Sequence, residues 1–446
     1  MQGKHKHEPQ LNMFKTQLKT LILDTHALVI LSYKIQWTSI DKEFEQYYSD
    51  SGRPSVPTRT MVGLLMLKSM FNESDESLIL RWVENPYWQY FCGEQFFNHA
   101  PPCDPSDLVH FRKRIQKTGV EYILKVSASL HCKAIKEEQV LIDTTVQEKD
   151  ITFPTDAKLA VGILKECWRL ADKSNVKLHQ SFSRKTAQAK LKLRFGSHPT
   201  KKTIARQAVR DLRKYAKKVI MQLRNHLPEE IKRYSEERFL FYDKILAQKR
   251  GDKKKIYSLH EPEVYCMSKG KAHKQYEFGC KVSIGVTAYT GIIVSATSFE
   301  TNVSDVHTLE QTLEQIRYVT ERNPTEAICD RGYRGKKKIN ETIITIPKPL
   351  PDSSTRYQKQ KVREKFRRRA SIEPLIGHLK YDHRMQRNFL KGVYGDFVNC
   401  VLAAAGFNLK KMLRLIASSL DSMKRCSYSI IYALINLFPR FEKVAF

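Results

Sequence analysis

Two short apolar segments, far apart in the chain, each end in an aspartate. Val140–Asp143 (VLID) and Ala327–Asp330 (AICD) have the continuous apolar character of buried β-strands. Strands that deliver an aspartate at their C-terminal ends can place both carboxylates at one edge of a sheet, where open sheets bind ligands. The chain has 47 acidic residues, so two of them can also follow apolar runs by chance. These strands alone leave a catalytic pair and a coincidence both open.

Further segments of the second half carry strand or helix patterns. They are two β-branched strands joined by a hairpin turn, then a helix and another short strand: 282–286, 292–297, 306–319 and 343–346. Ser304 and Asp305 stand where that helix begins, and both are predicted to cap it. The second half is therefore expected to contain a sheet with at least one helix packed on it.

A third carboxylate lies in a strongly basic segment, Phe366–Lys380, which reads FRRRASIEPLIGHLK. On a helix, four of its side chains fall within about 60° of one another: Phe366, Arg369, Glu373 and Lys380. An Arg one turn before a Glu is also explained by an ordinary i,i+4 ion pair. Pro374 removes a helical hydrogen bond, so the helix is expected either to kink there or to begin near Glu373.

The chain is strongly basic. Its 446 residues contain 77 Lys and Arg against 47 Asp and Glu, a formal net charge of +30. This excess favours a polyanionic partner, nucleic acid first and an anionic membrane second, because a small neutral substrate does not need it. The excess is concentrated in two blocks: residues 158–255 hold 28 basic and nine acidic residues, and residues 356–391 hold 12 and three.

The first basic block contains an amphipathic helix pattern. From Ile204 to Leu223 apolar residues recur at steps of three and four, which predicts one buried face. The cations gather elsewhere on the helix: Arg206, Arg210, Arg213 and Lys217. A basic face is often simply solvated, but the charge density of the whole block favours a nucleic-acid contact.

The N-terminal region predicts three short helices. Asp104 followed by Pro105 is a typical helix start, and that helix is expected to run to about Lys117. Its basic side chains share the face opposite Leu108, Phe111 and Ile115: His110, Lys113, Arg114 and Lys117. Helical segments over 58–71 and 76–84 precede it, so a helix-turn-helix-like DNA-recognition module is one interpretation. A small helical domain of any function gives the same pattern.

Several classes of protein are disfavoured. Residues 1–10 contain no apolar core of a signal peptide, and the longest apolar stretch, residues 430–438, is too short to span a bilayer. The nine cysteines form no C-x-x-C pair, so neither a zinc site nor a disulfide framework is indicated. A cytoplasmic protein with free thiols is expected.

These motifs together resemble a known family. Asp143, Asp330 within DRGYRG, and Glu373 within F-x-x-R-x-x-x-E-x-x-x-x-x-x-K are similar to the DDE transposases of bacterial insertion sequences, and the nearest group is insertion-sequence family five. Phe366 replaces the Tyr that is usual there, so a hydroxyl is lost. The stretch VLAAAGFNLKKML (401–413) and the region 37–114 are also similar to that group.

The resemblance implies an α/β catalytic core of RNase H-like type, with a mixed sheet flanked by helices. It also implies a helical N-terminal domain and a helical insertion after the first catalytic strand. The expected parts are an N-terminal DNA-end recognition domain, the first part of the core, the basic insertion, the rest of the core and a helical tail: 1–120, 121–157, 158–255, 256–416 and 417–446.

The implied chemistry is phosphodiester hydrolysis followed by transesterification. Two divalent ions about 3.5–4 Å apart can activate the attacking oxygen, stabilise the leaving oxygen and neutralise the phosphate. Carboxylates suit Mg²⁺, for which Mn²⁺ can substitute. The hypothesis assigns Asp143 as the bridging ligand, Asp330 to one ion and Glu373 to the other. Arg369 and Lys380 are expected to hold DNA phosphates, or else to pair with nearby carboxylates.

The expected function is that of an insertion-sequence transposase, which cuts transposon ends and joins the freed 3′-hydroxyl to target DNA. Its partners would be double-stranded DNA, both terminal inverted repeats and target, and a second copy of the chain in a nucleoid-associated synaptic complex. Two alternatives remain: an inactive nucleic-acid-binding derivative of the same fold, and a metal-dependent nuclease that cuts without joining.

Overall fold

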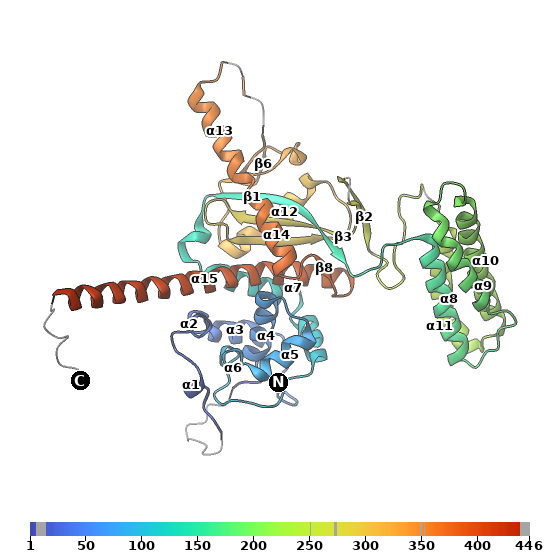
Figure 1. The fold of residues 1–446 in the computed structure, drawn as a ribbon, viewed down its shortest axis with the longest axis horizontal. Coiled ribbons are helices and arrows are strands. Elements are labelled where there is room, and N and C mark those ends of the chain that lie inside the picture. The colour runs from blue at the N-terminus through green and yellow to red at the C-terminus, as the bar shows by residue number, and fades with distance from the viewer. Residues whose placement is uncertain (6–14, 250, 272–273, 348–349, 352, 438–446) are drawn as a thin grey trace. The chain divides into compact units, whose positions relative to one another are not determined.

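The computed structural model describes residues 1–5, 15–249, 251–271, 274–347, 350–351 and 353–437. The chain divides into two compact units (Figure 1). The first unit is formed by Met1–Glu148 together with Lys281–Phe446, and the second by Lys149–Cys280. The expected basic insertion, residues 158–255, lies inside the second unit.

The strands form one mixed, eight-stranded sheet. Its order is β2-β3-β1-β5-β7-β6, with β4 paired to β3 and β8 to β1. The strands are β1 (Gln139–Lys149), β2 (Tyr265–Lys271), β3 (Lys274–Thr287), β4 (Ile293–Phe299), β5 (Glu326–Ile328), β6 (Lys338–Ile339), β7 (Thr342–Thr345) and β8 (Arg387–Asn388). β1, β5 and β7 run parallel, whereas β2, β3 and β4 form antiparallel pairs. Each strand expected from the apolar patterns is present, and the hairpin is the β3–β4 pair.

The strand that carries Asp143 is longer than its apolar run predicts. Val140, Leu141 and Ile142 are buried as expected, but β1 continues to Lys149 because it has further partners in β3 and β8. Asp143 therefore lies inside β1 and not at its end, whereas Asp330 lies just beyond the end of β5.

Short helices build the N-terminal region of the first unit. They are α1 (Leu18–Leu21), α2 (Ala27–Lys34), α3 (Trp37–Glu45), α4 (Thr58–Phe71), α5 (Asp75–Glu84), α6 (Pro86–Phe91) and α7 (Pro105–Ser129), followed by the 3₁₀ turn η1 (Cys132–Lys136). Asp104 caps α7 in a capping box with Asp107, as its sequence predicts. A non-helical residue, Gln116 with φ 54° and ψ −165°, interrupts α7 beside the expected end at Lys117.

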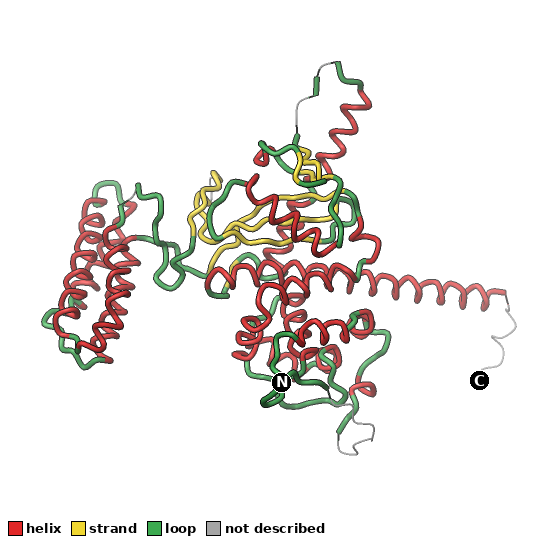
Figure 2. Tube along the Cα trace, turned by 180° about the vertical axis from the view of Figure 1, so that it is seen from behind, coloured by secondary structure: helices red, strands yellow, loops and turns green. Residues whose placement is uncertain are grey.

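A long C-terminal helix holds the first unit together. α15 (Gly392–Leu437) runs between the sheet on one side and helices α2, α4 and α7 on the other (Figures 1 and 2). Its buried residues, such as Val401 and Leu409, fill that layer. For this reason residues 1–120 are not a separate compact unit, and α15 continues without a break across the expected boundary at residue 416.

Two further elements of the first unit follow strands in the chain. α12 (Asp305–Thr320) comes after β4 and packs on it, and the short turn η3 (Arg331–Tyr333) follows β5.

The basic segment that carries Glu373 is broken into two helices. α13 (Arg356–Arg369) ends at Arg369, and α14 (Ile372–Asp382) begins after a link of two residues. Pro374 is thus accommodated in the first turn of a new helix, where its missing N–H costs no internal bond. This is the second of the two outcomes that the sequence left open.

The second unit has its own core. Four helices, α8 (Asp156–Lys173), α9 (Ser183–Lys192), α10 (Lys202–His226) and α11 (Glu229–Ala247), with the 3₁₀ turn η2 (Leu193–Ser197), pack around a shared apolar cluster. The stripe predicted in α10 is buried at Ala208, Leu212 and Leu223. Ile204, expected in the same stripe, is 40% exposed, because it lies in the first turn of the helix, beyond the core.

Within the part of the chain that the structure describes, no helix combines the length and the apolarity that crossing a bilayer requires. None of the eight cysteines described there is in a disulfide, and five of them are buried.

Candidate active site

The sheet brings Asp143 and Asp330 to the same level. β1 and β5 are parallel neighbours, and Leu141 is paired with Ile328. Each aspartate follows its paired residue by two positions, so the register of the two strands places the carboxylates side by side. This is the juxtaposition expected from strands that each deliver an aspartate.

One arginine contacts all three predicted carboxylates. The Arg369 Nη2 atom is 2.9 Å from Asp143 Oδ2 and 3.8 Å from Asp330 Oδ2. The Nη1 atom of the same guanidinium is 3.6 Å from Glu373 Oε1. Asp143, Asp330 and Glu373 therefore converge on a single positively charged group, although they come from β1, from the loop after β5 and from α14.

The three carboxylates differ in exposure, from 14% for the Asp143 side chain to 38% for Asp330 and 65% for Glu373. Burial raises the pKa of Asp143 to about 6, although the Arg369 charge and the hydrogen bond from the Thr144 N–H oppose the rise. The charges on Asp330 and Glu373 add to it. Asp143 is thus a buried anion that needs positive charge nearby.

The helix break explains how Arg369 reaches the carboxylates. Arg369 is the last residue of α13, Glu373 the second of α14, and Ala370 and Ser371 link them. The Arg369 side chain is only 18% exposed, and its Nε is buried without a hydrogen-bond partner in the described structure. Every carboxylate contact of Arg369 therefore involves the two terminal nitrogens.

The acidic cluster has some of the features that a divalent metal site requires. Three carboxylates supply the hard oxygen ligands that Mg²⁺ prefers. Among the described residues, however, no three Asp, Glu, His or Cys side chains are spaced to hold one ion. Arg369 lies between the carboxylates and supplies the positive charge. The residues fit divalent ions in chemical type, and binding such ions requires Arg369 to give up its carboxylate partners.

A fourth carboxylate lies beside this cluster. Asp305 was expected to cap α12, but its Oδ1 accepts hydrogen bonds from Thr144 Oγ1 at 2.8 Å and from Lys281 Nζ at 3.0 Å. The expected capping role was wrong for the Asp305 side chain, because Thr144 on β1 and Lys281 on β3 donate hydrogen bonds to it instead. Ser304 occupies the N-cap position without a capping side-chain bond and pairs instead with His307. Nothing local in the sequence signals the contact between Thr144 and Asp305.

The DRGYRG segment packs tightly against these carboxylates. The Gly332 N–H donates to Asp330 Oδ1 at 2.8 Å. A Cβ atom on Gly332 would lie 2.8 Å from Asp305 Oδ2 and 3.0 Å from Asp330 Oδ1. Tyr333 is fully buried, and burial together with the neighbouring carboxylates raises its pKa well above the usual value. Its hydroxyl therefore keeps its proton beside the acidic cluster.

The remaining two residues of the resembling motif lie on the two helices that carry Arg369 and Glu373. Lys380 is in α14, two turns after Glu373, and is half-buried. Phe366 is in the last turn of α13 and is also half-buried, so its ring packs where the related proteins carry a Tyr.

The predicted DNA-contacting side chains of α7 are all exposed: His110, Lys113, Arg114 and Lys117. Leu108, Phe111 and Ile115, on the opposite face, are buried as predicted. The face therefore has the expected separation of cationic and apolar side chains.

The predicted cationic face of α10 is divided in the structure. Arg206, Arg210 and Lys217 are exposed, as a DNA contact requires. Arg213 is instead half-buried, where it donates to the Gln248 carbonyl and lies 3.8 Å from Asp156. Its position on the helix is as predicted, but α8 and the end of α11 compete for its guanidinium, so it is the weakest of the four as a DNA ligand.

Comparison with known proteins identifies two segments. Residues 16–114 match the family described as Transposase domain (DUF772), and residues 235–409 match the family described as Transposase DDE domain. Asp330 and Glu373 lie inside the second match, whereas Asp143 lies between the two. No solved structure matches the chain significantly.

A curated relative extends the comparison. It is a protein of Rhizobium meliloti described as "Uncharacterized protein ORF8 in nfe locus", 41% identical over 192 residues. The similarity covers 42% of this chain and 93% of the relative. Together with the two family matches and the carboxylates brought together by the sheet, it shows that the chain belongs to the insertion-sequence DDE transposases.

Proposed function

We propose that the chain cuts the ends of an insertion sequence and joins the freed 3′-hydroxyl to target DNA, with Asp143, Asp330 and Glu373 as its catalytic carboxylates. The observation that carries this proposal is the convergence of the three side chains on one guanidinium. The three carboxylates are separated by up to 230 positions in the chain, and each could pair with a cation near it in sequence. The fold alone therefore does not require them to share one arginine.

We also propose that the core is of RNase H-like type. In the sheet β4 is paired with β3, and β3 with β1. The β3–β4 pair is antiparallel, whereas β5 and β7 continue the sheet in parallel with β1. The first aspartate is on the strand at the centre of this order and the second follows its parallel neighbour. The glutamate comes from a later helix, as the family resemblance implies.

Asp143, Asp330 and Glu373 are the residues that would hold Mg²⁺ or Mn²⁺. Bound divalent ions would supply charge stabilisation for the phosphate and lower the pKa of the attacking water or hydroxyl. The protein's own contribution is to orient the carboxylates. The Thr144 N–H and the Arg369 Nη2 hold the two oxygens of Asp143 separately, while Asp305 fixes the Thr144 side chain.

Arg369 is proposed to change partners during the reaction. In the free protein its charge is offset by the carboxylates, and positive ions arriving among them would repel it. The guanidinium would then be available to hold a DNA phosphate beside the acidic cluster, in the bidentate geometry that arginine favours. Lys380, on the same helix as Glu373, is proposed as a second phosphate contact.

The proposed partner is double-stranded DNA, bound as transposon ends and as target. The exposed cations of α7 and α10 are proposed to contact it, the first set at the transposon end. A homodimer that synapses two ends on nucleoid DNA is part of the same proposal, because joining needs two ends at one target.

A strand-transfer assay tests the reaction. Purified chain, DNA carrying the element's own inverted repeats, and Mg²⁺ or Mn²⁺ are expected to yield both cut ends and joined product. Cutting without joined product would support the nuclease alternative, and DNA binding without either product would support the inactive derivative.

The Asp143→Asn variant tests the assignment of the site. It is expected to abolish cutting and joining, because one of the carboxylates that would hold the ions is lost. The affinity for DNA is expected to stay within about twofold of that of the unaltered chain, because no cationic side chain is removed. A variant that still cuts DNA at the unaltered rate would show that the carboxylate assignment is wrong.

A further inference from the structure

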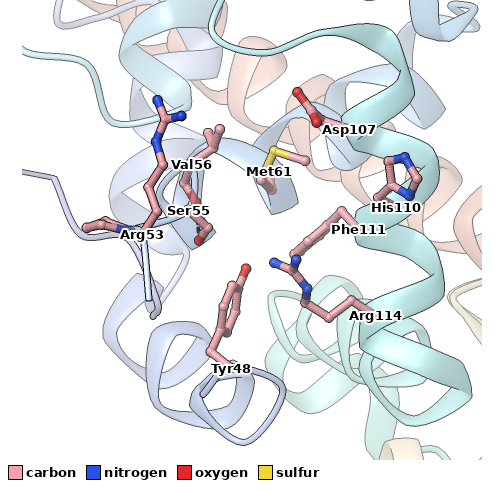
Figure 3. Close-up of a pocket in the computed structure, with 10 residues that line it drawn as sticks. Tyr48, Arg53, Ser55, Val56, Met61, Asp107, His110, Phe111 and Arg114 are labelled. Atoms are coloured by element: carbon pink, nitrogen blue, oxygen red, sulfur yellow. Dashed lines mark hydrogen bonds between the residues drawn. The ribbon is translucent and has the colours of Figure 1, made fainter. Parts of the chain in front are cut away.

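A small cavity opens between α7 and the loop that precedes α4. Its volume is about 350 Å³. Its polar and aromatic lining comes from that loop and from α7: Tyr48, Arg53, Asp107, His110, Phe111 and Arg114. Figure 3 shows the guanidinium of Arg114 and the hydroxyl of Tyr48 facing the same space. The cavity lies within the first unit and is separate from the carboxylate cluster.

The permanent charges around this cavity favour an anion. Arg53 and Arg114 are exposed, and neither forms an ion pair in the described structure. Asp107 is the one carboxylate on the wall, and its Oδ2 accepts a hydrogen bond from the Asp104 N–H in the capping box of α7. The Arg114 guanidinium therefore faces a cavity whose carboxylate is already engaged, and Arg53 adds a second cation at the wall.

The position of Arg114 suits phosphate in particular. Its guanidinium carbon lies over the ring of Tyr48, 5.0 Å from the ring centroid. A guanidinium that lies against an aromatic face is held in place while the N–H groups at its edge stay free to donate. That edge matches two oxygens of a phosphate, which a spherical anion does not offer.

The Tyr48 hydroxyl lacks a partner. Its oxygen is shielded from solvent and forms no hydrogen bond in the described structure. A buried hydroxyl without a partner is unfavourable, and an acceptor oxygen that reached it from the cavity after a small shift of the covering side chains would relieve this cost. Phe111 supplies an apolar wall beside it, so the cavity can also enclose the sugar next to a phosphate.

We propose that this cavity, called the Tyr48 pocket below, binds one phosphate of the DNA backbone with its adjoining sugar. Arg114 neutralises the phosphate, and the Tyr48 hydroxyl donates to one of its oxygens. Arg114 and His110 also belong to the cationic face of α7, so a phosphate anchored here would fix the register of the duplex along that helix. The proposal rests on the proposed function in taking DNA as the ligand.

Salt dependence of DNA binding separates the two kinds of contact. For each phosphate that a cation neutralises, the slope of log K against log salt concentration is steeper by about 0.9. Arg114→Gln in the full chain is therefore expected to weaken binding to a duplex and to reduce the slope by about 0.9. Tyr48→Phe is expected to weaken binding roughly threefold to tenfold with the slope unchanged, because a hydroxyl releases no counterion.

Matched variants provide the controls. Arg114→Lys keeps the charge and is expected to keep the slope. Lys42→Gln removes an exposed charge from α3 and is expected to leave both affinity and slope nearly unchanged. Thermal unfolding provides a second readout: Tyr48→Phe is expected to keep or raise the melting temperature of the free protein, because it removes an unpartnered hydroxyl.

Two results would overturn the proposal. One is an unchanged affinity and slope in both Arg114→Gln and Tyr48→Phe. The other is a melting temperature raised by millimolar inorganic phosphate, and lost in Arg114→Gln, with no effect of either variant on DNA affinity, since the ligand would then be free phosphate. Failure of the proposed function looks different, because DNA would be bound through the pocket but neither cut nor joined.

Discussion

The Arg369 guanidinium donates a hydrogen bond to the Asp143 carboxylate at 2.9 Å, although 226 residues separate them in the chain. Because the same group lies within ion-pair distance of Asp330 and Glu373, part of the negative charge of the acidic cluster is already compensated in the free protein. The basic block before Glu373 therefore supplies a cation to the acidic cluster itself. Arg369 places a positive charge among three carboxylates that would otherwise repel one another.

Replacing Arg369 with Gln is expected to raise the affinity of the protein for Mn²⁺ by about tenfold, because it removes a positive charge next to the proposed ligands. Calorimetric titration of the protein without DNA measures this directly. The same variant is expected to lower strand transfer, since the proposed phosphate contact is lost.

The neighbouring Arg367→Gln is the matched control. Arg367 is exposed, and in the described structure it contacts none of the three carboxylates, so its loss should leave Mn²⁺ affinity within about twofold. Equal Mn²⁺ affinities for Arg369→Gln and the unaltered chain would argue against competition between the guanidinium and the ions.

Gly332→Ala is expected to reduce cutting at least tenfold while the protein remains folded. The added Cβ would approach Asp305 Oδ2 and Asp330 Oδ1 to 3.0 Å or less, and both are the free ends of side chains that can move aside. The displaced atoms belong to the acidic cluster, so activity suffers more than stability. Cleavage rate and urea denaturation together check this.

Gly377→Ala provides the comparison for that substitution. Gly377 lies in α14, and a Cβ there would have no atom within 4 Å. This change is expected to stabilise the protein by about 0.5–1 kcal/mol through helix propensity and to leave cleavage unchanged. If Gly332→Ala behaved in the same way, the tight packing around Asp330 would have no catalytic importance.

The stability of the protein is expected to fall with acid partly through His383. Burial lowers the pKa of this imidazole to about 4, and its Nδ1 bonds to the Ser69 carbonyl at 2.8 Å. Because the unfolded chain binds this proton near pH 6.5 and the folded chain only near pH 4, the contribution is complete above pH 6.5 and is lost as pH falls towards 4. Urea denaturation across this range is expected to show a flatter pH dependence for His383→Gln than for the unaltered chain. Identical pH dependences would mean that other groups control acid unfolding.

The cationic face of α10 makes a prediction of its own. Neutralising Arg206, Arg210 and Lys217 together is expected to reduce the salt slope of DNA binding by about 2.7, if each neutralises one phosphate. Arg224→Gln should leave the slope unchanged and cost up to about 1 kcal/mol of stability, because Arg224 pairs with Glu236 and Asp243 inside the second unit. A larger change in slope for Arg224→Gln than for the triple variant would show that the DNA surface is placed wrongly.

The elements around the site could be predicted because their signals are local. Val140–Asp143 and Ala327–Asp330 are apolar enough to be strands by themselves, and the β3–β4 hairpin has its turn residues in sequence. Asp104 and Pro105 mark the start of α7 for the same reason. Pro374 indicated a helix break, whose position between Arg369 and Glu373 the structure then supplied.

The errors concern side chains whose partners are remote. Asp305 was expected to cap the start of α12, but its carboxylate accepts hydrogen bonds from Thr144 on β1 and Lys281 on β3. Arg213 shares a helical face with Arg206, Arg210 and Lys217, but tertiary contacts with Asp156 and Gln248 turn it inward. Periodicity identifies a face, whereas competition between potential partners on different elements decides which charges remain free.

The position of the second unit in the chain has an evolutionary consequence. The chain leaves the first unit on β1 and returns to it on β3, which are neighbouring strands of the sheet. Because the two crossing points are adjacent, a hairpin turn or a domain of any length can join them without altering the strand order. Gain, loss or exchange of this module would leave the acidic cluster intact, so related chains could differ in the module and still share one arrangement of carboxylates.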